Sequence, residues 1–173
     1  MSRSAQLPRL MSVLGAAFLL TACSTYRLGT GAETRFSSIY IAPITSDVTI
    51  PQAQALVGTQ VREAFVRDGR VSLANSPEKA DAVLRISLTG YDRNVTVSLP
   101  SDTGRARRFE VTLRAHATLT DNRTSQPLFA GRPLEARRGI FTDSGLVPSE
   151  YQGLPLLAEQ IAHEAVHAVL DAW

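Results

Sequence analysis

The sequence predicts an α+β fold, a two-layer sandwich in which two helices pack on one face of a mixed, mostly antiparallel sheet. Two observations predict it. Apolar and polar residues alternate with a period of two in the middle of the chain, and apolar residues recur at helical spacing in two other segments. The predicted order is strand, helix, several strands, helix, and helices gathered on one face of a mostly antiparallel sheet form two layers.

The first predicted elements are a strand and a helix. Residues 38–44 are almost continuously apolar and rich in β-branched residues, which is typical of a strand inside a sheet, ended by Pro43. Residues 45–50 are expected to form a loop. A helix should follow, with Pro51 in its first turn and Gly69 just after its last residue, as these residue types prefer. Its apolar residues at helical spacing are Val57, Val61, Ala64 and Phe65.

Residues 71–73 predict a short strand and residues 75–77 a turn. Residues 82–99 predict a long strand with a β-bulge at Gly90, because the apolar residues occupy even positions before the glycine and odd positions after it. A one-residue slip moves every side chain to the other face of a sheet, and a bulge produces that slip. A hairpin tip is expected at residues 100–104.

Residues 109–119 give the clearest strand signal, with apolar residues at every odd position and polar residues between them. Such a strand buries one face. The opposite face of the sheet should carry Arg85, Arg114 and His116. After a turn at 121–124, residues 128–131 and 134–141 predict a strand region that Pro133 breaks or confines to an edge.

A loop is expected at residues 143–148 and a second helix at 154–173. The apolar residues of this helix share one side at ~100° per residue. They are Leu154, Leu157, Ala158, Ile161, Ala165, Ala168, Val169 and Ala172.

The only cysteine closes a secretory signal. Arg3 and Arg9 precede an apolar run at 10–20, which is shorter than the roughly 20 residues needed to cross a bilayer as a helix. The ending Leu-Thr-Ala-Cys resembles the bacterial lipobox, in which the cysteine is lipidated and becomes the first residue. We therefore expect a signal peptide at 1–22, a lipidated tether at 23–36 starting with Cys23, and a single domain at 37–173.

The alternative to a lipobox is an ordinary secretory signal with an unpaired cysteine. Covalent modification of the thiol explains a lone cysteine in an oxidising compartment better than an unpaired free thiol does. Ser24 follows the cysteine where inner-membrane retention signals usually place aspartate. By that analogy, the predicted location is the outer membrane, on its periplasmic face.

The charge of the chain changes once the signal is removed. The full sequence has 18 Lys and Arg and 16 Asp and Glu, and the signal holds two of the arginines and no acid. The remaining chain is neutral, so it is not expected to bind nucleic acid. Residues 85–138 hold ten arginines and five acids, whereas residues 139–173 hold five acids and no Lys or Arg. This asymmetry indicates either an anionic partner or internal pairing.

The string His163-Glu164-Ala165-Val166-His167 matches H-E-x-x-H, the zinc-binding motif of metallopeptidases. Two features oppose a catalytic site. His116 is the only other histidine, so no usual third ligand follows, and the pair faces away from the apolar side of its helix. We expect a solvated helix face that holds no catalytic metal, and no cofactor. Chance metal binding by the two histidines is the remaining alternative.

The arginines offer a better candidate site. Arg105, Arg107 and Arg108 crowd the predicted hairpin tip, and Arg137 and Arg138 lie near another strand end. Guanidinium groups match phosphate oxygens with two parallel hydrogen bonds. In a periplasmic setting, the abundant ligand with several phosphates is lipopolysaccharide. The alternative is that these arginines protect edge strands and solvate a sheet face.

The chain resembles the lipopolysaccharide-assembly lipoprotein family, LptE. The resemblance rests on Cys23, the Ser-Ile-Tyr-Ile-Ala-Pro-Ile strand at 38–44, and the helix end Phe-Val-Arg-Asp-Gly-Arg-Val at 65–71. It continues through Ala-Asp-Ala-Val-Leu at 80–84, the strand at 109–119 with its Asp-Asn-Arg-Thr turn, and the closing helix. It departs at Ser24-Thr25-Tyr26, where family members often place glycine and an aromatic residue.

The resemblance implies a non-enzymatic protein that sits in the lumen of an LptD-type outer-membrane barrel, assists its assembly and binds lipopolysaccharide. The alternative is a periplasmic lipoprotein that regulates or assists a cell-wall or secretion complex. A third reading is a zinc metallopeptidase that uses His163, Glu164 and His167.

Overall fold

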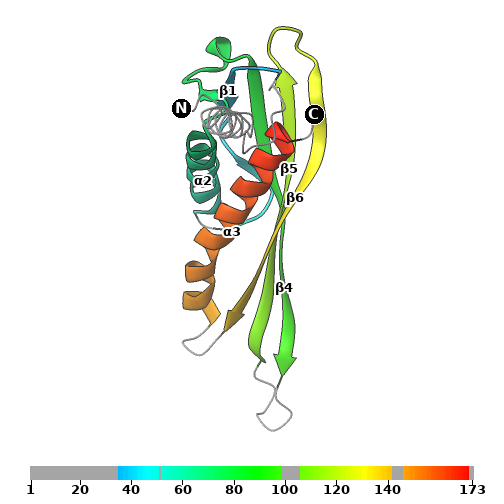
Figure 1. Ribbon diagram of the computed structural model, residues 1–173. Coiled ribbons are helices and arrows are strands. Elements are labelled where there is room, and N and C mark those ends of the chain that lie inside the picture. Colours follow the sequence, from blue (N-terminus) through cyan, green and yellow to red (C-terminus); the bar gives the residue numbers. More distant parts are fainter. Residues whose placement is uncertain (1–34, 51, 99–105, 142–145, 172–173) are drawn as a thin grey trace, which may run out of the picture. The chain divides into compact units, whose positions relative to one another are not determined.

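The structure is a computed structural model that describes residues 35–50, 52–98, 106–141 and 146–171 (Figure 1). Cys23, the predicted signal, the tether up to residue 34 and the predicted hairpin tip at 100–104 lie outside these residues. The described elements, in chain order, are β1 (Ser38–Ile41), β2 (Thr45–Ser46), α2 (Ala53–Asp68), β3 (Ser72–Leu73), the 3₁₀ turn η1 (Pro77–Lys79), β4 (Ala82–Ser98), β5 (Ala106–Asp121), β6 (Pro127–Phe141) and α3 (Leu146–Leu170).

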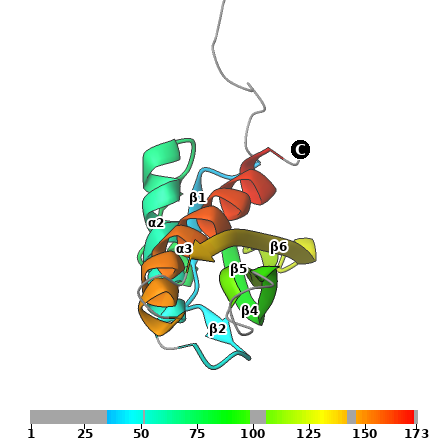
Figure 2. The same ribbon diagram turned by 90° about the horizontal axis from the view of Figure 1, so that it is seen from below.

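The strands form one mixed sheet in the order β3-β1-β4-β5-β6, with β2 beside β4. The pairs β1–β3, β1–β4 and β2–β4 are parallel, whereas β4–β5 and β5–β6 are antiparallel. Helices α2 and α3 contact each other on the same side of the sheet (Figure 2). The predicted two-layer α+β sandwich is therefore confirmed.

The first part of the chain is a β1–α2–β3 crossover, because two parallel neighbouring strands cannot be joined by a tight turn. The buried residues of α2 include three of the four predicted ones, Val57, Val61 and Phe65, while Ala64 is half-buried. The helix ends as predicted at Gly69, whose φ of 74° is left-handed. Glycine adopts this conformation without the steric cost of a Cβ.

The long strands confirm two predictions. The β4–β5 register shifts between Leu88 and Gly90, which places the predicted bulge at this point. In β5, the odd-numbered residues Val111 to Leu119 are all at most 1% exposed. The predicted alternation holds less well beyond the bulge, because Val95 is 58% exposed. There β4 and β5 continue past the end of the helical layer (Figure 1), so no helix covers that part of the sheet.

Strand β6 lies at the sheet edge, as Pro133 predicts. Two other predictions are wrong. Residues 45–46 are part of a strand and not of a loop, because they continue along the edge of β4 where β1 stops. Helix α3 begins at Leu146 and not at residue 154. Pro148 lies in its first turn, where the missing N–H costs nothing, and Pro155 is on the exposed side.

The core lies between the sheet and the two helices. The predicted apolar positions of α3 from Leu154 to Val169 are all buried there. The other face of the sheet has no helix against it in the described chain (Figure 2).

Candidate functional site

The sheet face opposite the helices carries charged side chains. In β5 the even-numbered residues point to this face, and Arg114 and His116 are exposed there, as is Arg85 of β4. All three residues therefore occupy the face predicted for them. Thr112 is the exception on this face of β5, because only 3% of it is exposed. The register places it between Asp92 and Arg137.

A ladder of ion pairs crosses this face from β4 to β6. Arg114 contacts Asp92 through Nη1, and its Nε lies 3.2 Å from Glu135 Oε2. Arg137 Nη2 lies 2.5 Å from Glu135 Oε1. The pairing raises the pKa of Arg114, chiefly through Asp92, and lowers the pKa of Glu135, chiefly through Arg137. Two carboxylates thus offset two guanidinium groups. Because both acids lie within residues 85–138, this pairing leaves the excess of arginines over acids in that region unchanged.

The five predicted phosphate-binding arginines do not share one face. Arg105 and the side chain of Arg107 lie outside the described part of the structure. The register places Arg108 and Arg137 on the open face and Arg138 on the helix face. The Arg108 guanidinium lies over Gly139 of β6, where a Cβ would be 3.2 Å from Nη2. The missing side chain leaves room for the guanidinium against the strand.

Arg138 borders a hollow of about 420 Å³ where β6 meets α3. The other lining residues come from the outer side of α3, namely Leu156, Glu159, Gln160, His163 and Glu164. Beside it, the backbone N–H of Arg137 donates to Gln160 Oε1 at 3.2 Å. The helix therefore satisfies a donor that edge strand β6 would otherwise direct to solvent.

The H-E-x-x-H string lies where the sequence predicts, on the exposed side of α3. His163, Glu164 and His167 are all exposed, and His116 lies on the opposite side of the sheet. Among the described residues, no three His, Cys, Asp or Glu side chains are grouped to hold a metal ion. A catalytic zinc site usually has three protein ligands, whereas the described part of the chain places two histidines here.

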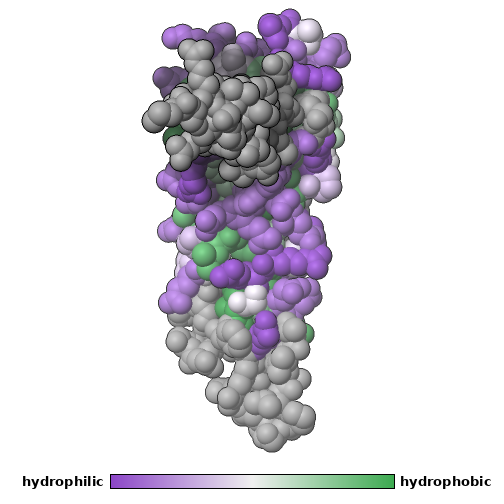
Figure 3. All heavy atoms as spheres, in the orientation of Figure 1, coloured by the Kyte–Doolittle hydropathy of each residue, from purple (hydrophilic) through white to green (hydrophobic). Residues whose placement is uncertain are grey.

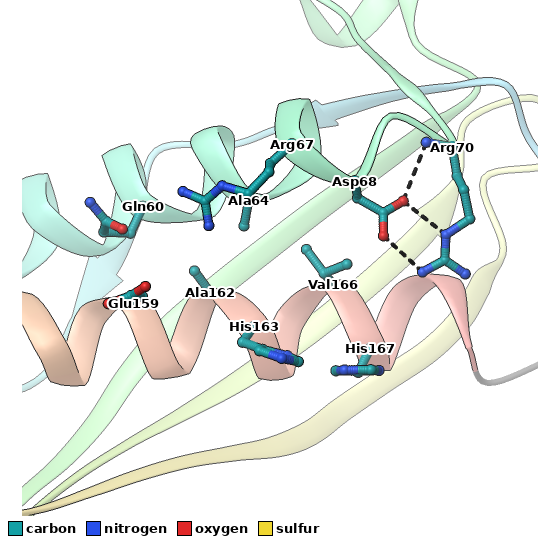
Figure 4. A pocket seen from close by; sticks show the side chains of 10 residues that line it. All are labelled: Gln60, Ala64, Arg67, Asp68, Arg70, Glu159, Ala162, His163, Val166 and His167. Atoms are coloured by element: carbon teal, nitrogen blue, oxygen red, sulfur yellow. Dashed lines mark hydrogen bonds and ion pairs between the residues drawn. The ribbon is translucent and has the colours of Figure 1, made fainter. Parts of the chain in front are cut away.

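The same helix face borders a groove of about 260 Å³ between α2 and α3 (Figure 4). At one end, Arg70 joins the two helical elements. Its Nε lies 2.8 Å from Asp68 Oδ1 and its Nη1 lies 2.6 Å from Asp171 Oδ1. Arg70 is the main cause of the lowered pKa values of both carboxyl groups. Sequence reasoning missed this network, because its members are ordinary surface residues far apart in the chain.

A second network that the sequence did not reveal joins β1 to the start of β4. Asp81 Oδ2 accepts hydrogen bonds from the backbone N–H and the hydroxyl of both Ser37 and Ser38, at 2.8 to 3.1 Å. These bonds, with the Ser37 hydroxyl first, lower the pKa of Asp81 to about 2. The role is structural, since the carboxylate joins the start of β1, which follows the predicted tether, to the residue just before β4.

Comparison with known protein families shows one match. The family model LptE, described as lipopolysaccharide-assembly, matches residues 36–171. The chain belongs to the LptE family. The match spans every described helix and strand, so the resemblance noted in the sequence is confirmed. No curated protein matches this member of the family significantly.

Solved structures share the fold of this LptE-family chain at low sequence identity. A solution structure of lipoprotein B from Nitrosomonas europaea is 22% identical, with a TM-score of 0.53, and the match covers 84% of this chain and 87% of that chain. A Xanthomonas campestris protein is 13% identical, with a TM-score of 0.59 and coverage of 82% and 89%. A hypothetical Chlamydia trachomatis protein is 12% identical, with a TM-score of 0.54 and coverage of 77% and 95%.

Two further properties of the described domain concern the hydrophobicity of its helices and of its surface. None of its helices is long and apolar enough to cross a membrane. The middle part of the view in Figure 3, which no grey atoms cover, is mostly hydrophilic, with small hydrophobic areas between polar ones. The large apolar side chains that remain exposed are Val66, Val95, Tyr151 and Leu156.

Proposed function

We propose that this protein is a non-enzymatic outer-membrane lipoprotein that occupies the lumen of an LptD-type barrel, helps the barrel to assemble and binds lipopolysaccharide for delivery to the cell surface. The observation that carries the proposal is the match of residues 36–171 to the lipopolysaccharide-assembly family. The open sheet face gives the domain a broad, polar surface for a partner. A pull-down of the mature protein from detergent-solubilised outer membranes, followed by identification of the captured proteins, tests the partner.

Capture of a large outer-membrane barrel supports the proposal. Capture of a cell-wall synthase or a secretion component instead would support the alternative, a periplasmic regulatory lipoprotein. A further variant is Arg85→Glu, which reverses the charge of an exposed side chain on the open face. Loss of the barrel from that pull-down alone would place the barrel contact on this face.

The membrane anchor rests on Cys23. Each buried acyl CH₂ contributes about 0.8 kcal/mol, and one chain alone anchors only marginally, so several acyl chains on the mature cysteine would hold the protein permanently at the periplasmic face. The variant Cys23→Ala is expected to lose fatty-acid labelling and to leave the membrane fraction with its domain folded. Recovery of this variant in outer membranes would contradict the anchor.

The lipid contact is assigned to Arg105, Arg107 and Arg108 near the predicted hairpin tip, and to Arg137 and Arg138 of β6. The observation that supports it is the position of Arg108 and Arg137 on one open face, where guanidinium groups can meet phosphate from solvent. The triple variant Arg105→Glu/Arg107→Glu/Arg108→Glu should bind purified lipopolysaccharide more weakly and keep its circular dichroism spectrum. Binding equal to that of the wild type would reject the assignment.

Two further variants separate the faces. Arg137→Ala changes the open face and Arg138→Ala the helix face, so unequal loss of lipopolysaccharide binding shows which face meets the lipid. Arg67→Glu is the control for charge alone, because Arg67 is an exposed arginine in the last turn of α2.

A further inference from the structure

The proposed function assigns no role to the two histidines of α3, yet their rings are stacked. His163 and His167 lie on successive turns of the helix with ring centroids 4.4 Å apart and ring planes 18° apart. Figure 4 shows the two rings next to each other along α3. Both residues are exposed. Two imidazoles one helical turn apart can reach the same ion.

The ring of His167 is held in place by a carboxylate. Its Nδ1 is hydrogen-bonded to Asp171 Oδ2, and Asp171 Oδ1 in turn accepts a hydrogen bond from Arg70 Nη1 at 2.6 Å. Because the carboxylate accepts from Nδ1–H, the lone pair of the neutral ring is on Nε2. Metal-ligating histidines usually have such a carboxylate on their second nitrogen, because it orients the ring and makes it more basic.

The second ring is available as well. Within the described chain, His163 has no hydrogen bond or ion pair, so none of the described residues occupies its two nitrogens. The hollows on both sides of His163 are lined by equal numbers of positive and negative side chains, namely Arg67, Arg70, Arg138, Asp68, Glu159 and Glu164. Asp171 adds one negative charge. A cation therefore meets no excess of positive charge here.

We propose that His163 and His167 form a binding site for one divalent transition-metal ion, with Asp171 as the residue that positions His167. Two imidazole nitrogens bind the ion and water completes its coordination. Imidazole suits Cu²⁺, Ni²⁺ and Zn²⁺, and the Irving–Williams order places Cu²⁺ first. With only two protein ligands, the site lacks the third ligand of a catalytic zinc centre, so it binds metal without peptidase chemistry.

The test is calorimetric titration of the full-length protein, purified in detergent without a polyhistidine tag, with Cu²⁺ and with Zn²⁺. We expect one ion per chain, tighter binding of Cu²⁺ than of Zn²⁺, and release of protons as the ligands bind. His163→Ala and His167→Ala should each abolish the binding. Asp171→Asn should weaken it by about 10- to 100-fold, the usual effect of removing such an outer partner.

Two controls make the result specific. His116→Ala removes the histidine on the opposite sheet face, and Asp47→Asn removes an exposed carboxylate in the loop after β2. Both should leave the affinity unchanged, and circular dichroism should show all variants folded. No binding by the wild type, or wild-type affinity in His163→Ala or His167→Ala, would overturn the site. Wild-type affinity in Asp171→Asn would overturn the positioning role of Asp171.

Discussion

Gly153 of α3 lies directly against Ile140 of β6, where a Cβ on the glycine would be only 3.1 Å from Ile140 Cδ1. Both residues are buried. Glycine inside a helix costs roughly 1 kcal/mol relative to alanine, and this close approach is a physical reason for its presence here. The contact sets how near the first half of α3 comes to the edge strand of the sheet.

Replacing Gly153 by valine should therefore destabilise the domain by about 1–3 kcal/mol, the usual cost of overpacking a core. The measurement is the free energy of unfolding in urea. Gln152→Val is the matched control, because Gln152 is an exposed neighbour on the same helix and reports the effect of a β-branched residue alone. If the two variants lose the same stability, the contact with Ile140 is not what excludes larger side chains.

Asp81 makes the stability of the fold depend on pH. The hydrogen bonds from Ser37 and Ser38 lower its pKa from 3.8 to about 2 in the folded protein. A lowered folded-state pKa contributes stability that is fully present above the unfolded-state value and is lost as the pH falls through the folded-state value. Asp81→Asn should therefore be less stable than the wild type at neutral pH, and the difference should shrink between about pH 4 and pH 2.

Urea unfolding of both proteins across that pH range checks this prediction. Asp47→Asn is the control, since Asp47 is an exposed carboxylate in the loop after β2. A difference between the wild type and Asp81→Asn that stays constant from pH 7 to pH 2 would mean that the hydroxyl and amide donors do not stabilise the charged form.

The fold could be predicted mainly where one face of an element is buried. The alternation at 109–119, the parity change at Gly90 and the glycine after Asp68 all have direct local causes. Strand β2 could not be found in this way, because two residues carry no periodicity and their pairing with β4 depends on the tertiary structure. The predicted start of α3 is wrong because the apolar positions at helical spacing begin only at Leu154, whereas the helix begins at Leu146. It accommodates Pro148 in its first turn and Pro155 on its exposed side.

The candidate site shows the same limit. Arg137 and Arg138 are adjacent in sequence, and successive residues of a strand point to opposite faces of a sheet. The sequence pattern alone therefore predicts that these two side chains lie on opposite faces. The pairing of Arg114 with Asp92 and Glu135 needed the register of three strands. The contact of Arg70 with Asp171 joins residues 101 positions apart, and no local pattern indicates it.

The contact between Arg70 and Asp171 should couple the end of α2 to the end of α3. Both side chains are partly exposed, at 29% and 25%, so a double-mutant cycle with Arg70→Ala and Asp171→Ala should give a coupling free energy of about 0.5–1 kcal/mol. The coupling should decrease at 1 M salt, because salt screens exposed charges. Arg67→Ala with Asp171→Ala is the control cycle and should show no coupling. Additive effects in the first cycle would contradict the contact.

Gln160 protects the edge of the sheet by accepting the backbone N–H of Arg137. Edge strands expose unpaired donors that can pair with other chains, and here one donor is covered by a side chain of α3. In Gln160→Ala the Arg137 amide should exchange with deuterium faster, while amides between β5 and β6 keep their protection. Gln160→Glu is the matched control, because its carboxylate can still accept the hydrogen bond. Equal exchange of the Arg137 amide in all three proteins would show that Gln160 leaves the edge unprotected.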